Sequence, residues 1–204
     1  MTTIIMSRFF ALLTVVADAF VVGSIVVMVM GRRSSSARAF IATARSFFAE
    51  YGLVLAAGVA VTCTLGSLYL SEVANFVPCK LCWFQRIAMY PLAVILGVAA
   101  YKKDHTVLRY VVPIAAIGAS ISTYHYLLER FPQIASSASC DPTAPCTVVW
   151  IWQFHFISIP FMALSGFAAI VALLFWARPI SKEERADEHR LARSAAPQGS
   201  LQAS

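Results

Sequence analysis

The stretch PCKLCWFQRIAMYPL, residues 78–92, places Cys79 and Cys82 at the start of a long apolar run. Pro78 ends whatever element precedes it, so both cysteines should fall in the first turn of the helix that follows. Amide dipoles at a helix amino terminus favour anions, and Lys80 adds positive charge. A cysteine in such a place is expected to have a lowered pKa and to be reactive. The stretch therefore predicts a reactive Cys-x-x-Cys pair at the mouth of an apolar helix.

The composition of the chain indicates a membrane protein. Hydrophobic residues make up 59% of the 204 positions and charged residues 13%, and the mean hydropathy is +0.73. A soluble domain carries about a quarter charged residues, so this chain has too few polar side chains to cover a globule. Its long apolar segments are continuous rather than alternating, which predicts an all-α transmembrane bundle and excludes strands. The expected spans are residues 9–30, 51–70, 83–101, 107–128 and 154–177.

A second pair of cysteines, Cys140 and Cys146, lies in the loop SSASCDPTAPCTVVWIWQF, residues 136–154. A cysteine that must react with an outside protein should be exposed there. Two thiol pairs in loops on the same side of a membrane can pass electrons to one another by thiol–disulfide exchange. The alternatives are a stabilising disulfide in this loop and, for Cys-x-x-Cys, a static disulfide or half of a zinc site.

The basic residues predict how the spans are oriented. Twelve of the sixteen Lys and Arg residues lie between the first and second spans, between the third and fourth, or after the fifth. By the positive-inside rule these three segments are cytoplasmic and the amino terminus is outside. Both cysteine pairs then face the exterior. The basic linker after the first span is expected to be a helix on the inner membrane surface or a plain connecting helix.

Four further residues bear on the chemistry. Arg86 lies four positions after Cys82, on the same helix face, where it can hold a negative charge or donate to a carbonyl oxygen. The alternative role for Arg86 is a snorkelling membrane anchor. Gln85 is a candidate second donor to a bound acceptor. By position alone, His125 is a packed or interfacial residue, and Cys63 inside the second span is a small apolar filler.

Residues 67–97, SLYLSEVANFVPCKLCWFQRIAMYPLAVILG, resemble the DsbB family of bacterial disulfide-forming membrane proteins. The short loop of the second cysteine pair and the following FISIPFMAL, residues 156–164, are most similar to its BdbC branch. The resemblance covers residues 51–177. It implies a four-helix bundle in the bacterial cytoplasmic membrane that reoxidises an extracytoplasmic thioredoxin-fold partner of the DsbA or BdbD kind. Electrons would pass to ubiquinone or menaquinone, with no metal involved.

The resemblance also implies roles for the cysteines. By family analogy the reduced partner attacks the Cys140–Cys146 disulfide at Cys140, and the released Cys146 attacks Cys79. Cys82 is then left as a thiolate beside the quinone.

Two other residues match the family pattern. Arg86 corresponds to the family arginine beside the quinone, and His125 corresponds to a family histidine near the acceptor site.

Three rival interpretations of the sequence stay open. A vitamin K epoxide reductase-like protein also couples loop cysteines to quinone, although its Cys-x-x-Cys follows the loop pair. A membrane module that binds a metal through its cysteines, and a structural protein stapled by two disulfides, belong to other classes.

The chain is expected to divide into three parts. Residues 1–50 add a transmembrane helix and a basic cytoplasmic linker, about which the resemblance says nothing. Residues 51–177 form the four-helix redox domain, and residues 178–204 form a charged cytoplasmic tail that is expected to be disordered.

Overall fold

The computed structural model describes residues 2–31, 35–134 and 144–178 of the chain. Within these residues the fold is all-α, and five helices are long and apolar enough to cross a membrane, as predicted. The protein is therefore a multi-pass membrane protein. Its elements are α1 (Thr2–Gly31), α2 (Ser35–Leu68), the π-helical turn η1 (Tyr69–Val73), α3 (Lys80–Lys102), the short 3₁₀ helix η2 (His105–Val107), α4 (Leu108–Arg130), the 3₁₀ helix η3 (Pro132–Ile134) and α5 (Ile159–Trp176).

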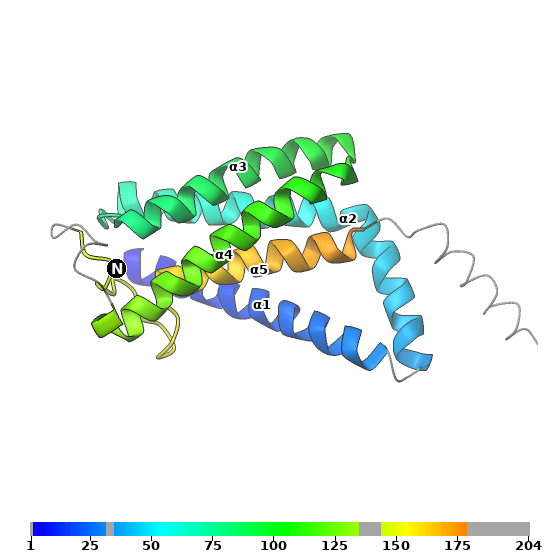
Figure 1. The fold of residues 1–204 in the computed structure, drawn as a ribbon, viewed down its shortest axis with the longest axis horizontal. Helices are drawn as coiled ribbons and strands as arrows, with labels where there is room; N and C mark the ends of the chain where they lie inside the picture. The colour runs from blue at the N-terminus through cyan, green and yellow to red at the C-terminus, as the bar shows by residue number, and fades with distance from the viewer. Residues whose placement is uncertain (1, 32–34, 135–143, 179–204) are drawn as a thin grey trace, which may run out of the picture.

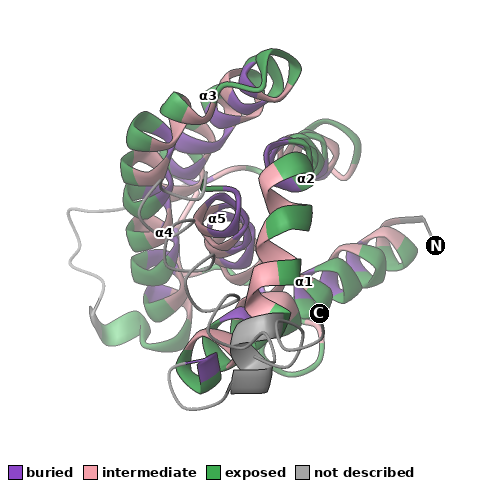
Figure 2. Ribbon diagram, turned by 90° about the vertical axis from the view of Figure 1, so that its right-hand side faces the viewer, coloured by how far each residue is buried: buried purple, intermediate pink, exposed green. Residues whose placement is uncertain are grey.

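Helix α5 lies at the centre of the bundle and α1 lies at its edge. α5 packs against α1, α2 and α4, while α3 packs against α2 and α4. Figure 2 shows α5 enclosed by α2, α3 and α4, with α1 to one side. Of the 18 most apolar consecutive residues in each helix, 50% are buried in α5, whereas only 11% are buried in α1. The fold is thus a four-helix bundle with one additional helix on its outside.

The core of the bundle is formed by side chains of α2, α3, α4 and α5. Leu92 and Leu96 of α3 and Phe167 and Ile170 of α5 are fully buried within it. Gly118 of α4 permits the close approach of Phe167, because a Cβ atom at this position would overlap the ring. Lipid tails are as apolar as leucine, so this close packing, rather than the hydrophobic effect, holds the helices together.

The loops that carry the cysteines lie at one end of the bundle. Figure 1 shows the α2–α3 and α4–α5 connections at the same end as the start of α1. The C-terminal ends of α1 and α5 and the α3–α4 turn lie at the opposite end. Lys102 and Lys103 in that turn are exposed. The fold therefore separates the cysteine end from the end where the basic connections lie.

The basic linker belongs to one long helix with the second span. α2 begins at Ser35 and continues to Leu68, so the linker is helical, as both of the expected alternatives require. Figure 1 shows the first part of α2 turned across the end of the bundle before the helix enters it.

The last span starts later than predicted. α5 begins at Ile159 and not at residue 154, because the chain first makes a tight turn. Phe154 and His155 have positive φ values of 51° and 65°, and an isolated bridge pairs Gln153 with Ile157. His155 therefore lies in a loop and not in the span, for which residues 154–177 were expected.

Candidate functional site

The Cys-x-x-Cys pair lies at the amino terminus of α3. Cys79 is the N-cap residue, so it precedes the first turn instead of belonging to it, and its Sγ accepts from the backbone N–H of Cys82 at 3.4 Å. The Cys79 thiol donates to Cys82 Sγ at 3.2 Å. The two side chains are thus placed as a reduced pair that a disulfide bond can join.

Cys79 holds its proton more firmly than the sequence predicts. The hydrogen bond to Cys82, together with burial, raises the pKa of the Cys79 thiol to about 12. The expectation of a lowered pKa is therefore wrong for this cysteine, because its thiol is 5% exposed and donates to a neighbouring sulfur. Cys82 receives that hydrogen bond, so a negative charge on the pair is better placed on Cys82.

In the fully reduced protein we expect Cys79 to resist alkylation between pH 7 and pH 9. A pKa of about 12 makes its thiolate fraction roughly a thousandfold smaller than that of an unperturbed cysteine with a pKa of about 8.5. Iodoacetamide labelling followed by peptide mass spectrometry should show Cys79 reacting at least about a hundredfold more slowly in the native than in the denatured protein. Equal rates in the two states at pH 8 would contradict this account of the pair.

His125 of α4 reaches the pair from the facing helix. Its side chain is 2% exposed, and Nε2 lies 3.5 Å from Cys79 Sγ. Gln85 of α3, which is also buried, donates from Nε2 to His125 Nδ1 at 3.1 Å. This bond leaves the proton of a neutral imidazole on Nε2, facing the sulfur. His125 is packed, as its position predicts, but it is packed against the Cys79 thiol, and Gln85 sets its tautomer.

Cys146 of the second pair is buried, while Cys140 lies outside the described residues. The Cys146 side chain is 1% exposed and packs in the same apolar cluster as Cys79. The loop folds back over the start of α3, where Trp150 stacks on Phe76 with ring centroids 5.1 Å apart. The exposure expected for a cysteine that meets an outside protein is therefore not found at Cys146, whose position suits a reaction with the inner pair.

Arg86 reaches from α3 to the end of α2. Its Nη2 donates to the backbone oxygen of Ser67 at 3.0 Å, and its guanidinium carbon lies 5.3 Å from the Trp83 ring centroid. Its positive charge also acts on Cys82. A guanidinium has five N–H donors, so Arg86 can keep the bond to Ser67 and still donate to a carbonyl oxygen or an anion.

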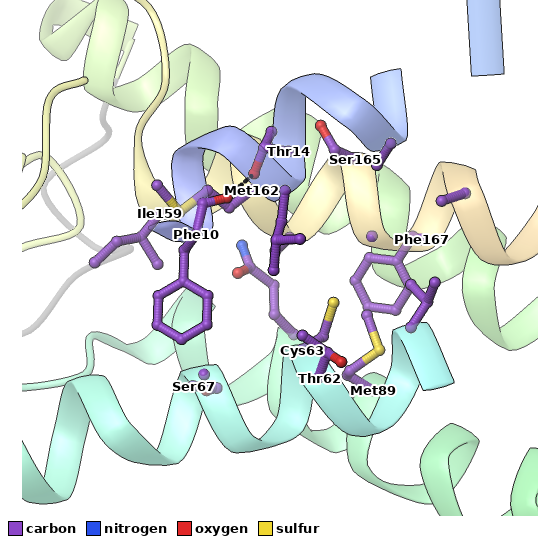
Figure 3. Close-up of a pocket in the computed structure, with 18 of the residues that line it drawn as sticks. Phe10, Thr14, Thr62, Cys63, Ser67, Met89, Ile159, Met162, Ser165 and Phe167 are labelled. Atoms are coloured by element: carbon purple, nitrogen blue, oxygen red, sulfur yellow. Dashed lines mark hydrogen bonds between the residues drawn. The ribbon is translucent and has the colours of Figure 1, made fainter. Parts of the chain in front are cut away.

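A cavity of about 890 Å³ lies between α1, α2, α3 and α5. Cys82 and Arg86 line one part of it, and apolar side chains line most of the rest. Figure 3 shows Phe10 and Thr14 of α1 across the cavity from Met89 of α3. Sites for small molecules are typically about 300–1,000 Å³ in volume and largely apolar, with a few polar groups. The cavity therefore fits an apolar molecule with a polar end.

Three contributions to the site were not predicted from the sequence. Glu129 lies one turn after His125 and lines, with Cys79, a small cavity of about 10 Å³ below the loop. Glu129 follows His125 by four positions, and this spacing could have indicated that the two side chains share one face of the helix. Ser67 contributes a backbone oxygen, which no side-chain pattern reveals. The third contribution is the part of the cavity wall that α1 forms. No sequence motif marks those residues.

The same geometry would also suit part of a metal site. The ligand atoms of Cys79, Cys82 and His125 all lie within 4.8 Å of one another. Structural zinc normally takes four such ligands.

Comparison with known proteins relates this site to a family. A family model described as "Disulfide bond formation protein DsbB" matches residues 49–177. The probable disulfide formation protein C 1 of Bacillus cereus is 46% identical over 126 residues, which cover 62% of this chain and 91% of the relative. The disulfide bond formation protein C of Bacillus subtilis is 47% identical over 116 residues, which cover 57% of this chain and 84% of the relative.

A further relative, the probable disulfide formation protein of Deinococcus radiodurans, is 45% identical over 134 residues, covering 62% of this chain and 88% of its own length. No solved structure matches the chain. The family match spans more than half of the chain and contains all four paired cysteines. Relatives named disulfide formation protein C also confirm the predicted BdbC branch. This chain belongs to the DsbB family of disulfide bond formation proteins.

Proposed function

We propose that this membrane thiol oxidoreductase reoxidises an extracytoplasmic thioredoxin-fold protein and passes the electrons to a membrane quinone. The observation that carries the proposal is the continuity of the site. Cys146 lies in the same small buried cluster as Cys79 and Leu128, and Cys82, which packs against that cluster, lines the large apolar cavity. This arrangement supports a relay in which sulfur atoms would carry electrons from Cys146 to the edge of the cavity.

The cysteines would act through successive thiol–disulfide exchanges. A partner thiolate attacks Cys140 and releases Cys146, which attacks Cys79 and releases Cys82. The partner's second thiolate and then Cys140 resolve the two mixed disulfides. The partner and the loop pair end oxidised, and Cys79 and Cys82 end as a dithiol, so two electrons have moved inward.

His125 would stabilise the charge that this sequence places on Cys79. When the bond between Cys146 and Cys79 breaks, Cys79 leaves as a thiolate, which is unfavourable for a thiol with a pKa of about 12. The Nε2–H group of His125, 3.5 Å away, is placed to donate to that sulfur. Gln85 acts through His125 by holding the tautomer that makes this donation possible.

The residues around the large cavity fit a quinone. Arg86 and Gln85 are polar donors that line the cavity together with Cys82, where they would hold a carbonyl oxygen, and the remaining wall is mostly apolar. A bound quinone would accept two electrons and two protons from the Cys79–Cys82 dithiol. The dithiol would thereby return to the disulfide. A partner with a reduction potential of about −120 mV needs an acceptor stronger than ordinary thiols.

The direct test is quinone reduction by the purified full-length protein, with a reduced thioredoxin-fold protein as electron donor. We expect one quinone reduced for each disulfide formed in the donor, and assays with ubiquinone and menaquinone show which acceptor is used. Exchange between donor and loop cysteines without reduction of either quinone would refute the quinone step.

We also propose that the cysteine end of the bundle lies outside the bacterial cytoplasmic membrane. In a cysteine-free background, single cysteines near Ser137 should react with an impermeant maleimide in intact cells. Cysteines in the linker, residues 32–46, should react only after permeabilisation, because that linker carries four arginines that the positive-inside rule keeps in the cytoplasm. Labelling of the linker in intact cells would show that α1 does not span the membrane as proposed.

A metal-binding module is the second candidate, favoured by the cluster of Cys79, Cys82 and His125. Metal analysis of the purified protein combined with a free-thiol count separates the two functions. The oxidoreductase predicts disulfides in the resting protein and no stoichiometric metal. A stoichiometric metal with four reduced loop cysteines would favour the module.

The division of the chain into residues 1–50, 51–177 and 178–204 remains part of the proposal. The family match from residue 49 to residue 177 supports the central unit. Apart from residue 178, the tail lies outside the described residues.

A further inference from the structure

Helix α1 is an addition of this chain to the family bundle. The family match begins at residue 49, after α1 has ended. The Bacillus cereus relative is matched over 91% of its length, so its unmatched part is shorter than the roughly 20 residues that a span requires. The role of α1 must therefore be inferred from its own contacts.

Polar contacts at two depths attach α1 to the bundle. Near the cysteine end, Gln153 Nε2 donates to Ser7 Oγ at 3.2 Å. Eleven residues further along α1, the carboxyl group of Asp18 lies close to the hydroxyl of Ser165 of α5. An acidic side chain inside a span is costly unless it has a partner or faces protein. These contacts fix which face of α1 is turned toward the bundle.

The face of α1 that is turned toward the bundle forms one wall of the large apolar cavity that Cys82 and Arg86 also line. Its contributing residues are Phe10, Leu13, Thr14, Val16, Ala17 and Phe20. Figure 3 shows the ring of Phe10 pointing from this wall toward α2, while the Thr14 hydroxyl donates back to the Phe10 backbone oxygen at 2.9 Å.

The wall is longer than a quinone ring. From Phe10 to Phe20 it extends about 15 Å at 1.5 Å per residue. Phe10 lies beside Tyr69 of η1, at the cysteine end of the bundle, with ring centroids 6.5 Å apart. Phe20 lies beside Phe48, in the interior of α2, with centroids 5.6 Å apart. A ring held near Cys82 leaves the deeper part of the cavity for something long and apolar.

We propose that α1 is the binding surface for the isoprenoid tail of the quinone, so that this chain selects its acceptor by the tail as well as by the ring. The inference rests on the proposed function, because the same cavity must hold the ring beside Cys82. It adds a binding element outside the family domain. Truncating the chain to that domain would remove this wall and expose the cavity to lipid.

Two alanines on α1 provide a matched test in the full-length protein. Ala17 lines the cavity, whereas Ala19 is exposed and does not line it. In Ala17→Phe the added ring should occupy tail space and weaken the binding of a long-tailed ubiquinone by about tenfold or more. Binding of a tail-less quinone should stay within about twofold of wild type. Ala19→Phe should resemble wild type with both ligands.

Binding is measured as the rise in melting temperature of the purified protein during quinone titration, which does not depend on turnover. If Ala17→Phe lowers the ligand-free melting temperature, the smaller Ala17→Leu takes its place. Equal binding of the long-tailed quinone by the two phenylalanine variants would overturn the inference, as would equal losses with both quinones. Wild-type protein that binds no quinone would overturn the proposed function as well, which distinguishes the two failures.

Discussion

Serine in place of any one relay cysteine should abolish steady-state oxidation of a reduced thioredoxin-fold protein. The relay cysteines are Cys79, Cys82, Cys140 and Cys146. Each sulfur forms or breaks a bond in a different exchange, so no other residue can substitute for it. Serine is nearly the same size but cannot form a disulfide, so the loss should exceed about a thousandfold, as for a removed nucleophile. The measurement is turnover of the purified variants with quinone in excess.

The four variants should also fail at different stages. With Cys82→Ser, partner exchange at the loop should still occur once, because the loop pair is intact. With Cys140→Ser, the partner should remain reduced from the first mixing. Rapid acid quenching followed by thiol trapping separates these cases. Near-normal turnover in any of the four would refute the relay.

Cys63→Ser is the matched control. Cys63 lies in α2 with its Sγ against Gly166 of α5, where an added Cβ would be only 2.6 Å from the sulfur. Its packing against the core agrees with the small apolar filler predicted from the sequence. Serine fits the same space, so we expect turnover within about threefold of wild type. Because Cys63 also lines the large cavity, a complete loss with unchanged quinone binding would mean that the relay uses a fifth cysteine.

The fold was predictable because few backbone structures can span a lipid bilayer. A span in lipid must satisfy its backbone internally, so length and apolar composition were enough to predict five helices. The start of α5 was less predictable. Residues 154–158 are largely apolar, like a span, but positive φ values at Phe154 and His155 turn the chain there. Such a local turn leaves little trace in a hydropathy pattern.

The site was predictable where one helix carries it and less so where helices meet. Cys82 and Arg86 lie in α3 and Cys79 is its N-cap residue, so their spacing indicated their proximity. The contact between Cys79 and His125 joins residues 46 positions apart, and the sequence pattern alone does not bring α3 and α4 together. The hydrogen bond that Cys79 donates to Cys82, together with burial, reversed the expected direction of the Cys79 pKa. The residue spacing shows neither which sulfur donates nor how deeply the thiol is buried.

Arg86→Lys should raise the apparent KM for quinone by about ten- to a hundredfold, while partner exchange at the loop cysteines stays largely intact. Arg86 already gives one N–H to the Ser67 oxygen at 3.0 Å, and its flat guanidinium lies against Trp83. A lysine ammonium is a point charge without the planar fork, so it cannot hold Ser67 and a quinone oxygen in the same geometry. A hydrogen bond to a charged group contributes roughly 1.5–3 kcal/mol, which corresponds to this loss.

The alternative role for Arg86, a membrane anchor, makes the opposite prediction, because lysine snorkels as well as arginine. Arg8→Lys is the matched control, since Arg8 lies exposed near the start of α1 and does not line the cavity. The experiment is quinone kinetics of both purified variants at saturating reduced partner, together with a single-turnover measurement of exchange at the loop. A raised KM in Arg86→Lys alone assigns the guanidinium to the acceptor. Unchanged KM and kcat in both variants would make Arg86 an anchor, and the charge on Cys82 would then have to be stabilised by the Cys79 thiol that donates to it.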